Sequence, residues 1–453
     1  MKASGRSVRS DRGAWLVPLL LIFIVVTCCS MTTVLRSSTP GDPAFLQAVV
    51  TSIALCAFVP LFAMARFSFG YFAGVAFFSM IVGFFWTTFF TGLAYDHVMA
   101  RWSALASLLL FLLPALFQTM PIPRAPLLSQ RAMASLMLVL LALSAGLLVL
   151  SATYGFALVG LEQAEQLRAS FPRPTILNYM MGWIISAVLP FAFAYFAWHR
   201  RYWLAAMAIV LLWCSYPVLL NKSVLFGGLW LPYLFILFRL FEPRRAAVYS
   251  LLILMLPGIA VYFLMEYSWL SGDGTLGHAL RFVLGNVNIR MFGYPSLAMN
   301  NYSDYFEHHP LTHYCQIGVI RAIYGCPYPF QLGAAMAEAY HMGSMNGSLF
   351  ATEGIASAGQ ILAPLSALVC GIIVSFGNSA SARLPAPVMA TSAGFAVQQS
   401  LLNAPLSVCL LSNGLLVLWL LWAVSPPMEE QPVVGLAGLV RKRNRQVGAS
   451  PAN

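Results

Sequence analysis

The sequence predicts an all-α integral membrane protein that crosses the bilayer about twelve times. Of its 453 residues, 60% are hydrophobic and only 9% are charged. The apolar residues also fall in runs of about 20, the length a helix needs to span the hydrocarbon core. The first run follows a basic segment without a clean small-residue cleavage site, and this predicts a retained first helix rather than a cleaved signal peptide.

The apolar runs divide the chain into spans and connections. Spans are expected at residues 14–35, 44–64, 69–93, 102–118, 132–152, 176–198, 202–220, 224–238, 246–265, 355–377, 386–402 and 404–424. Residues 1–265 thus hold nine helices with a smaller loop at 151–175. A large loop follows at 266–354, then three helices at 355–424 and a basic tail at 425–453.

The basic residues predict the orientation. Most of the 25 Lys and Arg residues fall in connections on one side of the membrane if the N-terminus is cytoplasmic, as the positive-inside rule requires. Both termini are therefore expected in the cytoplasm, and the two longer loops on the other side. The net charge of +11 then reflects topology and contact with lipid headgroups rather than nucleic acid binding.

Polar chemistry is concentrated in the large loop, which holds most of the seven histidines. Its stretch "FQLGAAMAEAYHMGS" has helical periodicity and predicts a short helix at the membrane interface. Cys315 and Cys326 lie in this loop, where an oxidising compartment would favour a disulfide; two unpaired thiols are the alternative. The other cysteines lie in spans and are expected to pack as small apolar residues.

Several activities are disfavoured by missing motifs. The sequence has no phosphate-binding G-x-x-x-x-G-K loop and no G-x-S-x-G nucleophile elbow. The cluster Asp304, Glu307, His308, His309 and His313 is interrupted by Pro310 and matches no familiar ligand spacing. We therefore expect no metal and no cofactor. Without ATP outside the cytoplasm, a substrate that carries its own leaving group, such as a lipid-linked pyrophosphate sugar, fits best.

Eight of the 25 basic residues are expected on the side that the positive-inside rule disfavours, and two of them stand out. Lys222 follows a very tight turn between two spans, and Arg290 lies in the large loop. Both are candidate ligands of an anion, because a cation near hydrocarbon is costly unless it is partnered. The alternatives are a snorkelling lysine at a helix end and a structural ion pair of Arg290 with a loop carboxylate.

Three segments resemble one family. They are "NKSVLFGG" with Lys222, "RMFGYPSLAMNNYSDYFEHHP" with Arg290, and "NGSLFATEGIASAG" with Asn346 and Glu353. In the order and spacing of these segments, and in the side of the membrane on which they are expected, the chain resembles the Wzy-type O-antigen polymerases. These are also called oligosaccharide repeat unit polymerases and belong to a wider group that includes the O-antigen ligases. The ligases place a histidine directly before the asparagine. Here that residue is Met345, which favours a polymerase.

The resemblance implies a glycosyltransferase of the bacterial inner membrane that polymerises undecaprenyl pyrophosphate-linked repeat units at the periplasmic face, with a chain-length regulator as a partner. Lys222 and Arg290 would bind the pyrophosphate, with Arg281 and Arg321 as secondary candidates. Either His341 or Glu353 would be the general base, and the sequence does not choose between them. Glu353 could instead only complement a helix dipole.

Further roles follow from the same resemblance. Asn346 would orient the substrate or the base, and Tyr302 and Tyr305 would stack on sugars or belong to the aromatic belt. The alternative functions are an O-antigen ligase that transfers glycan to lipid A core and, in another class, a flippase for lipid-linked oligosaccharide.

Overall fold

The described part of the chain folds mainly into helices in the computed structural model. The described residues are 15–35, 43–118, 127–160, 163, 167, 171–266, 285–329, 331–341 and 345–429, and they contain no β-strand. Ten helices within these ranges are long and apolar enough to cross a membrane: Leu16–Leu35, Ala44–Met64, Phe69–Thr87, His97–Phe117, Gln130–Ala152, Thr175–Trp198, Tyr202–Leu219, Lys222–Leu240, Pro243–Val261 and Phe350–Ser381. The protein is therefore an all-α, multi-pass membrane protein.

The helices belong to two compact units. Unit 1 comprises Met1–Ile122, Val248–Ser379 and Ala396–Asn413. Its elements are α2 (Leu16–Leu35), α3 (Pro43–Ser52), η1 (Ile53–Phe58), α4 (Val59–Met64), α5 (Phe69–Thr87), α6 (His97–Phe117), most of α14 (Pro243–Glu266), α16 (Asn286–Asn288), η4 (Ile289–Gly293), α17 (Tyr294–His308), α18 (Gly318–Tyr324), α19 (Leu332–Tyr340), η5 (Phe350–Ala356), most of α20 (Ser357–Ser381), η6 (Ala396–Leu401) and α22 (Leu406–Leu411).

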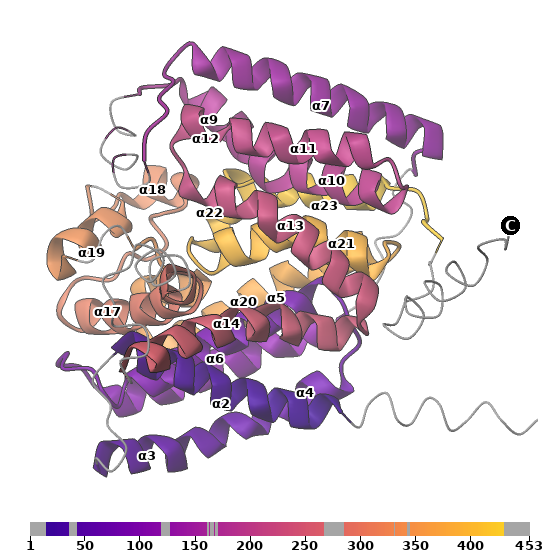
Figure 1. Cartoon of the computed structure of the whole chain (residues 1–453). Coiled ribbons are helices and arrows are strands. Elements are labelled where there is room, and N and C mark those ends of the chain that lie inside the picture. Colours follow the sequence, from indigo (N-terminus) through magenta and orange to yellow (C-terminus); the bar gives the residue numbers. More distant parts are fainter. Residues whose placement is uncertain are drawn as a thin grey trace, which may run out of the picture. The chain divides into compact units, whose positions relative to one another are not determined.

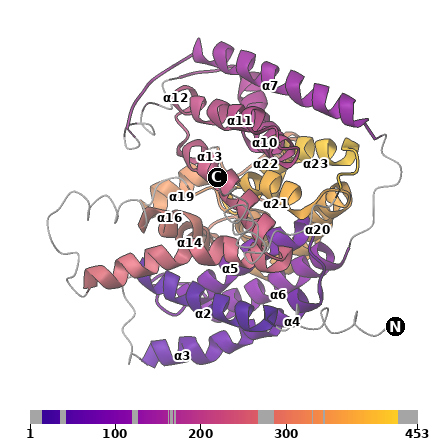
Figure 2. The same cartoon turned by 45° about the vertical axis from the view of Figure 1, so that its right-hand side comes forward.

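Unit 2 comprises Pro123–Ala247, Ala380–Phe395 and Gly414–Asn453. Its elements are α7 (Gln130–Ala152), α9 (Thr175–Trp183), η2 (Ile184–Val188), α10 (Leu189–Trp198), α11 (Tyr202–Cys214), α12 (Tyr216–Leu219), α13 (Lys222–Leu240), α21 (Ala386–Phe395) and α23 (Leu415–Val424). The buried helix α10 packs against α11 and α21, and α7 lies alongside α11 (Figure 2).

Helix α5 forms the core of unit 1, and every one of its residues is buried. It begins where the Ser68 hydroxyl accepts a hydrogen bond from the Tyr71 amide at 3.1 Å, a normal N-cap. Helices α2, α6 and α17 pack around it. Gly70 is required by the close approach of α6, because a Cβ at this position would overlap the Ala115 carbonyl oxygen.

The Asn378 amide joins three helices at one end of unit 1. Its Oδ1 accepts from the Gly70 amide of α5 at 2.6 Å, and its Nδ2 donates to the carbonyl oxygens of Ala115 and Gln118 at 2.8 and 2.7 Å. At the opposite end, α17, α18 and α19 lie together (Figure 1). We call this second end of α2, α5, α6 and α20 the loop end of unit 1.

Several expected elements have different bounds in the structure. The span expected at 102–118 begins at His97, because the Asp96 carboxylate caps the helix by accepting from the amides of Val98 and Met99 at 2.9 Å. The spans expected at 386–402 and 404–424 are formed by shorter pieces, α21 with η6 and α22 with α23. The helix expected in "FQLGAAMAEAYHMGS" is present as α19.

The start of the span expected at 355–377 was wrong by several residues, since helix already begins at Phe350. Phe350 is buried against the rings of Phe77 and Phe111, with centroids 5.1 and 5.5 Å away. This packing extends the buried helix toward the large loop. Glu353 therefore lies inside a helical segment rather than in front of it.

Candidate functional site

Glu353 has the most unusual environment of the proposed site residues. It is 5% exposed, and among the described residues no other Asp, Glu, Lys, Arg or His side chain is buried. Its Oε1 accepts from the Ser407 amide at 3.1 Å and from the Ser407 hydroxyl at 3.3 Å. Its Oε2 has no hydrogen-bond partner in the described part of the chain. One carboxylate oxygen is thus fixed and the other is left to accept a proton or a hydrogen bond.

The backbone around Glu353 is a π-helix, η5, which turns more widely than an α-helix. Such segments are often found at functional sites. The carbonyl of Glu353 accepts from the Ser366 hydroxyl at 2.6 Å, which stabilises the wide turn from the following helix α20. η5 packs against α17.

Helix α17 also fixes the segment that precedes η5. The Tyr302 hydroxyl donates to the Met345 carbonyl at 3.2 Å. Gly347 has a φ of +67°, and a Cβ there would lie 3.0 Å from Tyr302 Cζ and 2.9 Å from Thr352 Oγ1. Tyr302 is fully buried, which raises the pKa of its phenol. Its ring presents no face to a ligand in this arrangement and acts instead as a support.

His341, the other candidate base, lies at the end of α19 and is exposed. Its backbone is left-handed with a φ of 52°, and its amide donates to the Ala337 carbonyl at 3.0 Å. The preceding residue, Tyr340, donates to Asp304 Oδ2 of α17 at 2.6 Å, and its oxygen is 3.0 Å from the Asn301 carbonyl oxygen. Helix α17 therefore supports both candidate bases through neighbouring residues.

The candidate cations of unit 1 lie at its surface. Arg290 is an exposed residue of η4, with its guanidinium carbon 4.6 Å from the centroid of the Tyr294 ring. This cation–π contact orients the side chain without neutralising its charge. Arg321 is an exposed residue of α18 and donates to the Pro329 carbonyl at 3.4 Å. Arg281 lies outside the described residues.

Lys222 belongs to unit 2 and is the first residue of α13. Asn221 caps this helix, and its Oδ1 accepts from the Ser223 amide at 3.1 Å. Leu220 is left-handed with a φ of 52°, which closes the expected tight turn between α12 and α13. The Lys222 side chain is half-buried, so the turn limits where its ammonium group can reach.

The remaining proposed residues also lie in unit 1. Asn346 is exposed, and its carbonyl accepts from Thr352 Oγ1 at 3.1 Å. The Tyr305 ring stacks on His309, with centroids 3.8 Å apart and planes within 3°, so one of its faces is covered. A disulfide joins Cys315 and Cys326. No group of His, Cys, Asp and Glu in the described ranges is arranged to hold a metal ion.

A pocket of about 260 Å³ opens at the loop end of unit 1. Its polar lining includes the carboxylates of Asp96 and Glu307 and the amide of Gln360, and its apolar lining includes Phe306 and Ile355. Most of the accessible lining of this pocket is apolar, with a smaller polar share.

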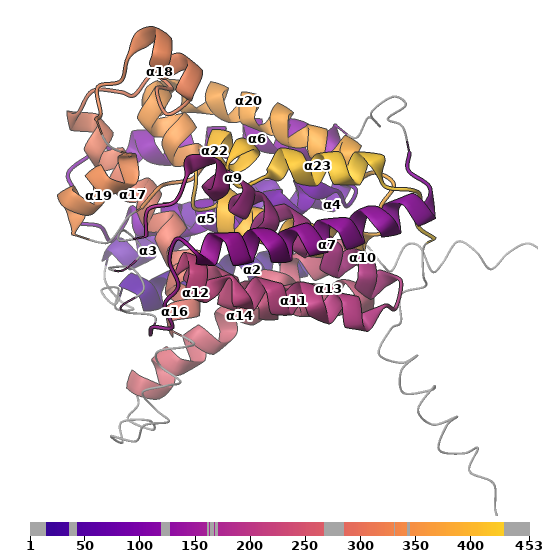
Figure 3. The same ribbon diagram turned by 90° about the horizontal axis from the view of Figure 1, so that it is seen from above.

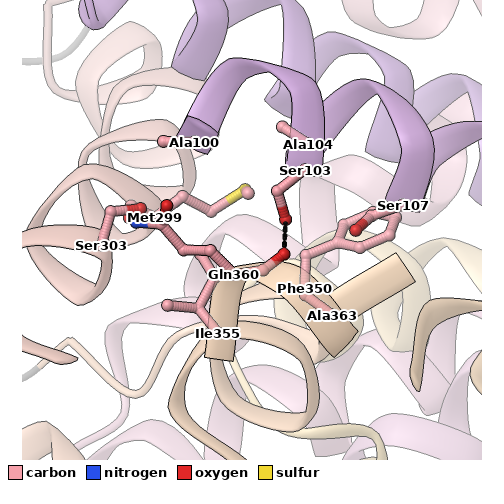
Figure 4. A pocket seen from close by; sticks show the side chains of 10 residues that line it. All are labelled: Ala100, Ser103, Ala104, Ser107, Met299, Ser303, Phe350, Ile355, Gln360 and Ala363. Carbon is pink, nitrogen blue, oxygen red and sulfur yellow. Dashed lines mark hydrogen bonds between the residues drawn. The ribbon is translucent and has the colours of Figure 1, made fainter. Parts of the chain in front are cut away.

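A much smaller cavity of about 10 Å³, the space of roughly one water molecule, shares Ser303, Ile355 and Gln360 with the larger pocket. Figure 4 shows the side chains around it. The Ser103 hydroxyl of α6 donates to the Gln360 carbonyl of α20 at 2.5 Å. Phe350 and Ile355, on either side of Glu353 in the chain, both line this cavity.

Sequence reasoning missed the residues that hold the site together. Ser407, which fixes Glu353, follows Pro405 at the start of α22, and the proline was the only local signal of a helix start there. The contact between Tyr340 and Asp304 joins residues 36 positions apart, and no periodicity predicts it.

Comparisons of the chain with protein families, curated proteins and solved structures found no match. The function is therefore argued from the residues of the site.

Proposed function

We propose that the protein is a membrane glycosyltransferase that polymerises undecaprenyl pyrophosphate-linked oligosaccharide repeat units into O-antigen or a related surface polysaccharide. It would act at the periplasmic face of the bacterial inner membrane. The observation that carries the proposal is the buried Glu353 carboxylate, with Oε1 fixed by Ser407 and Oε2 without a partner among the described residues.

The reaction requires a base and a stabilised leaving group. Glu353 Oε2 takes the proton of the acceptor sugar hydroxyl while that oxygen bonds to the anomeric carbon of the donor. The bond from this carbon to the pyrophosphate oxygen breaks, and undecaprenyl pyrophosphate leaves with the electron pair. The bonds formed and broken in this step balance without a nucleotide or a redox partner. Glu353 is preferred to His341 because its carboxylate is held in one orientation.

The negative charge that develops on the pyrophosphate needs a cation at the membrane surface. Arg290 suits this role because it is exposed and held on the Tyr294 ring. A guanidinium can form two parallel hydrogen bonds with phosphate oxygens. Lys222 is proposed as a second pyrophosphate ligand on the strength of the family resemblance.

The residue before Asn346 favours a polymerase over a ligase. Met345 is buried, and its sulfur lies 3.7 Å from Asn301 Nδ2 of α17. A side chain at this position points into the protein and supplies no titratable group, whereas the ligases carry a histidine there. The Asn301 contact supports a structural role for residue 345.

The test uses the purified full-length protein in liposomes with an undecaprenyl pyrophosphate-linked repeat unit and neither nucleotide nor metal. The expected product is a ladder of glycans that grows by whole repeat units. Transfer of a single glycan to added lipid A core would indicate a ligase instead. Movement of the lipid-linked sugar across the vesicle membrane without new glycosidic bonds would indicate a flippase. Either result would overturn the proposal.

A further inference from the structure

The short helix α18 is unusual because none of its residues is buried. It lies within the segment that the disulfide between Cys315 and Cys326 closes. Val319, Ile323 and Tyr324 are 70, 68 and 83% exposed. Val319 and Ile323, four residues apart, share one face of the helix, and Tyr324 extends this exposed surface around the adjoining side. An apolar face of this kind is unfavourable in water and indicates a contact with another surface.

The closed segment is attached where α20 begins. The Thr312 amide donates to the Ala356 carbonyl at 2.8 Å, and the hydroxyls of Thr312 and Ser357 are 2.9 Å apart. Gln316 Nε2 donates to the Ser357 hydroxyl at 3.0 Å. Three hydrogen bonds thus fix the base of the segment at the first residues of a membrane-spanning helix.

Helix α20 becomes lipid-facing just beyond this attachment. Ile361, Leu362 and Leu365 are 75, 57 and 59% exposed, in a helix apolar enough to cross a membrane. Figure 3 shows α18 projecting outward beside the beginning of α20, on the same side of unit 1. α18 therefore lies beside the start of a helix that is apolar enough to cross a membrane.

The charge of the segment also fits a lipid surface. Residues 311–329 contain no Asp or Glu, and Arg321 of α18 is exposed. A tyrosine and an arginine beside aliphatic residues are typical of helices that lie in the membrane interface. The cation attracts anionic phospholipids.

We propose that α18 is an interfacial anchor. Val319, Ile323 and Tyr324 insert at the acyl boundary of the bilayer, and Arg321 binds the phosphates of anionic phospholipids. The anchor holds the loop end of unit 1 at a fixed depth. This inference does not depend on the proposed enzymatic activity, since it rests on exposure, attachment and charge.

The test replaces Tyr324 with the photoreactive residue p-benzoylphenylalanine in the full-length protein. After irradiation in native membranes, mass spectrometry identifies what is joined to position 324. Because Tyr324 is exposed, this change leaves the fold intact. Leu362 is the matched lipid-facing control, and the exposed Glu338 of α19 is the matched water-facing control.

The expected result is a phospholipid adduct at position 324, with a yield close to that at 362 and several-fold above that at 338. In liposomes the yield should rise when phosphatidylglycerol replaces part of the phosphatidylcholine, and Arg321→Glu should abolish this rise. A polypeptide adduct at 324, from a second copy or another protein, would overturn the proposal. A lipid yield no higher than at 338 would also overturn it.

Discussion

Replacing Glu353 with glutamine tests the proposed general base with the smallest change in shape. Glutamine keeps an oxygen at the position of Oε1, so both hydrogen bonds from Ser407, at 3.1 and 3.3 Å, can remain. The amide group replaces Oε2, which has no partner in the described residues. The substitution thus removes the proton-accepting oxygen and preserves the contact that orients the side chain.

The two consequences of this change have different magnitudes. A buried NH₂ group that finds no acceptor costs about 1 to 2 kcal/mol of folding free energy. Loss of a general base lowers the rate by about 100- to 10,000-fold. This corresponds to about 3 to 5 kcal/mol of transition-state stabilisation. Catalysis should therefore suffer far more than stability.

The assay compares polymer ladders made by equal amounts of parent and Glu353→Gln protein in liposomes, with thermal unfolding in detergent as the measure of folding. Ser407→Ala is the matched control, because it removes the hydroxyl contact to Oε1 and keeps the amide contact; its rate should fall less. Parent-like ladder growth by a folded Glu353→Gln protein would refute the assignment of the base and leave His341 as the candidate.

Three further substitutions test other parts of the structure. Arg290→Ala should remove about 2 to 4 kcal/mol of transition-state stabilisation in the ladder assay at unchanged membrane abundance, and a full parental rate would exclude this cation. Tyr340→Phe should cost about 1 to 2 kcal/mol of folding stability, because a hydrogen bond to the α17 carboxylate is lost. Burial and that bond raise the pKa of Tyr340 above its ordinary value of 10.0, so the parent should lose stability as the pH rises above about 10, and the variant should show a smaller alkaline decline in thermal unfolding. Gly70→Ala should destabilise unit 1 by about 1 to 3 kcal/mol or more, because its Cβ overlaps the Ala115 carbonyl oxygen; Gly146→Ala, which meets nothing within 4 Å, is the control that should leave thermal unfolding nearly unchanged.

Hydrophobicity made most of the fold predictable. Apolar runs identified the long helices because a bilayer leaves the backbone no partners outside the helix. The boundaries were less accurate, since tertiary contacts decide them. One helix begins at His97 because Asp96 caps it there. Another begins at Phe350 because this side chain packs against Phe77 and Phe111.

The candidate site was predictable in composition but not in geometry. Glu353 could be selected because the stretch "NGSLFATEGIASAG" resembles the family pattern at the entry to a span. Its burial and its contact with Ser407, 54 residues later, depend on how η5 and α22 pack. Tyr302 shows the limit of such reasoning. An aromatic residue in a polar loop suggested sugar stacking, whereas its fully buried ring supports the backbone of Met345.

The Asn378 amide and the Ser103 hydroxyl have a joint consequence for helices α6 and α20. The amide ties α5, α6 and α20 together at the end away from α17, with three hydrogen bonds of 2.6 to 2.8 Å. At the loop end, the Ser103 hydroxyl and the Gln360 carbonyl join α6 to α20. α6 and α20 are thus hydrogen-bonded to each other near both of their ends, so two separate contacts would have to break before these helices could move apart beside the pocket.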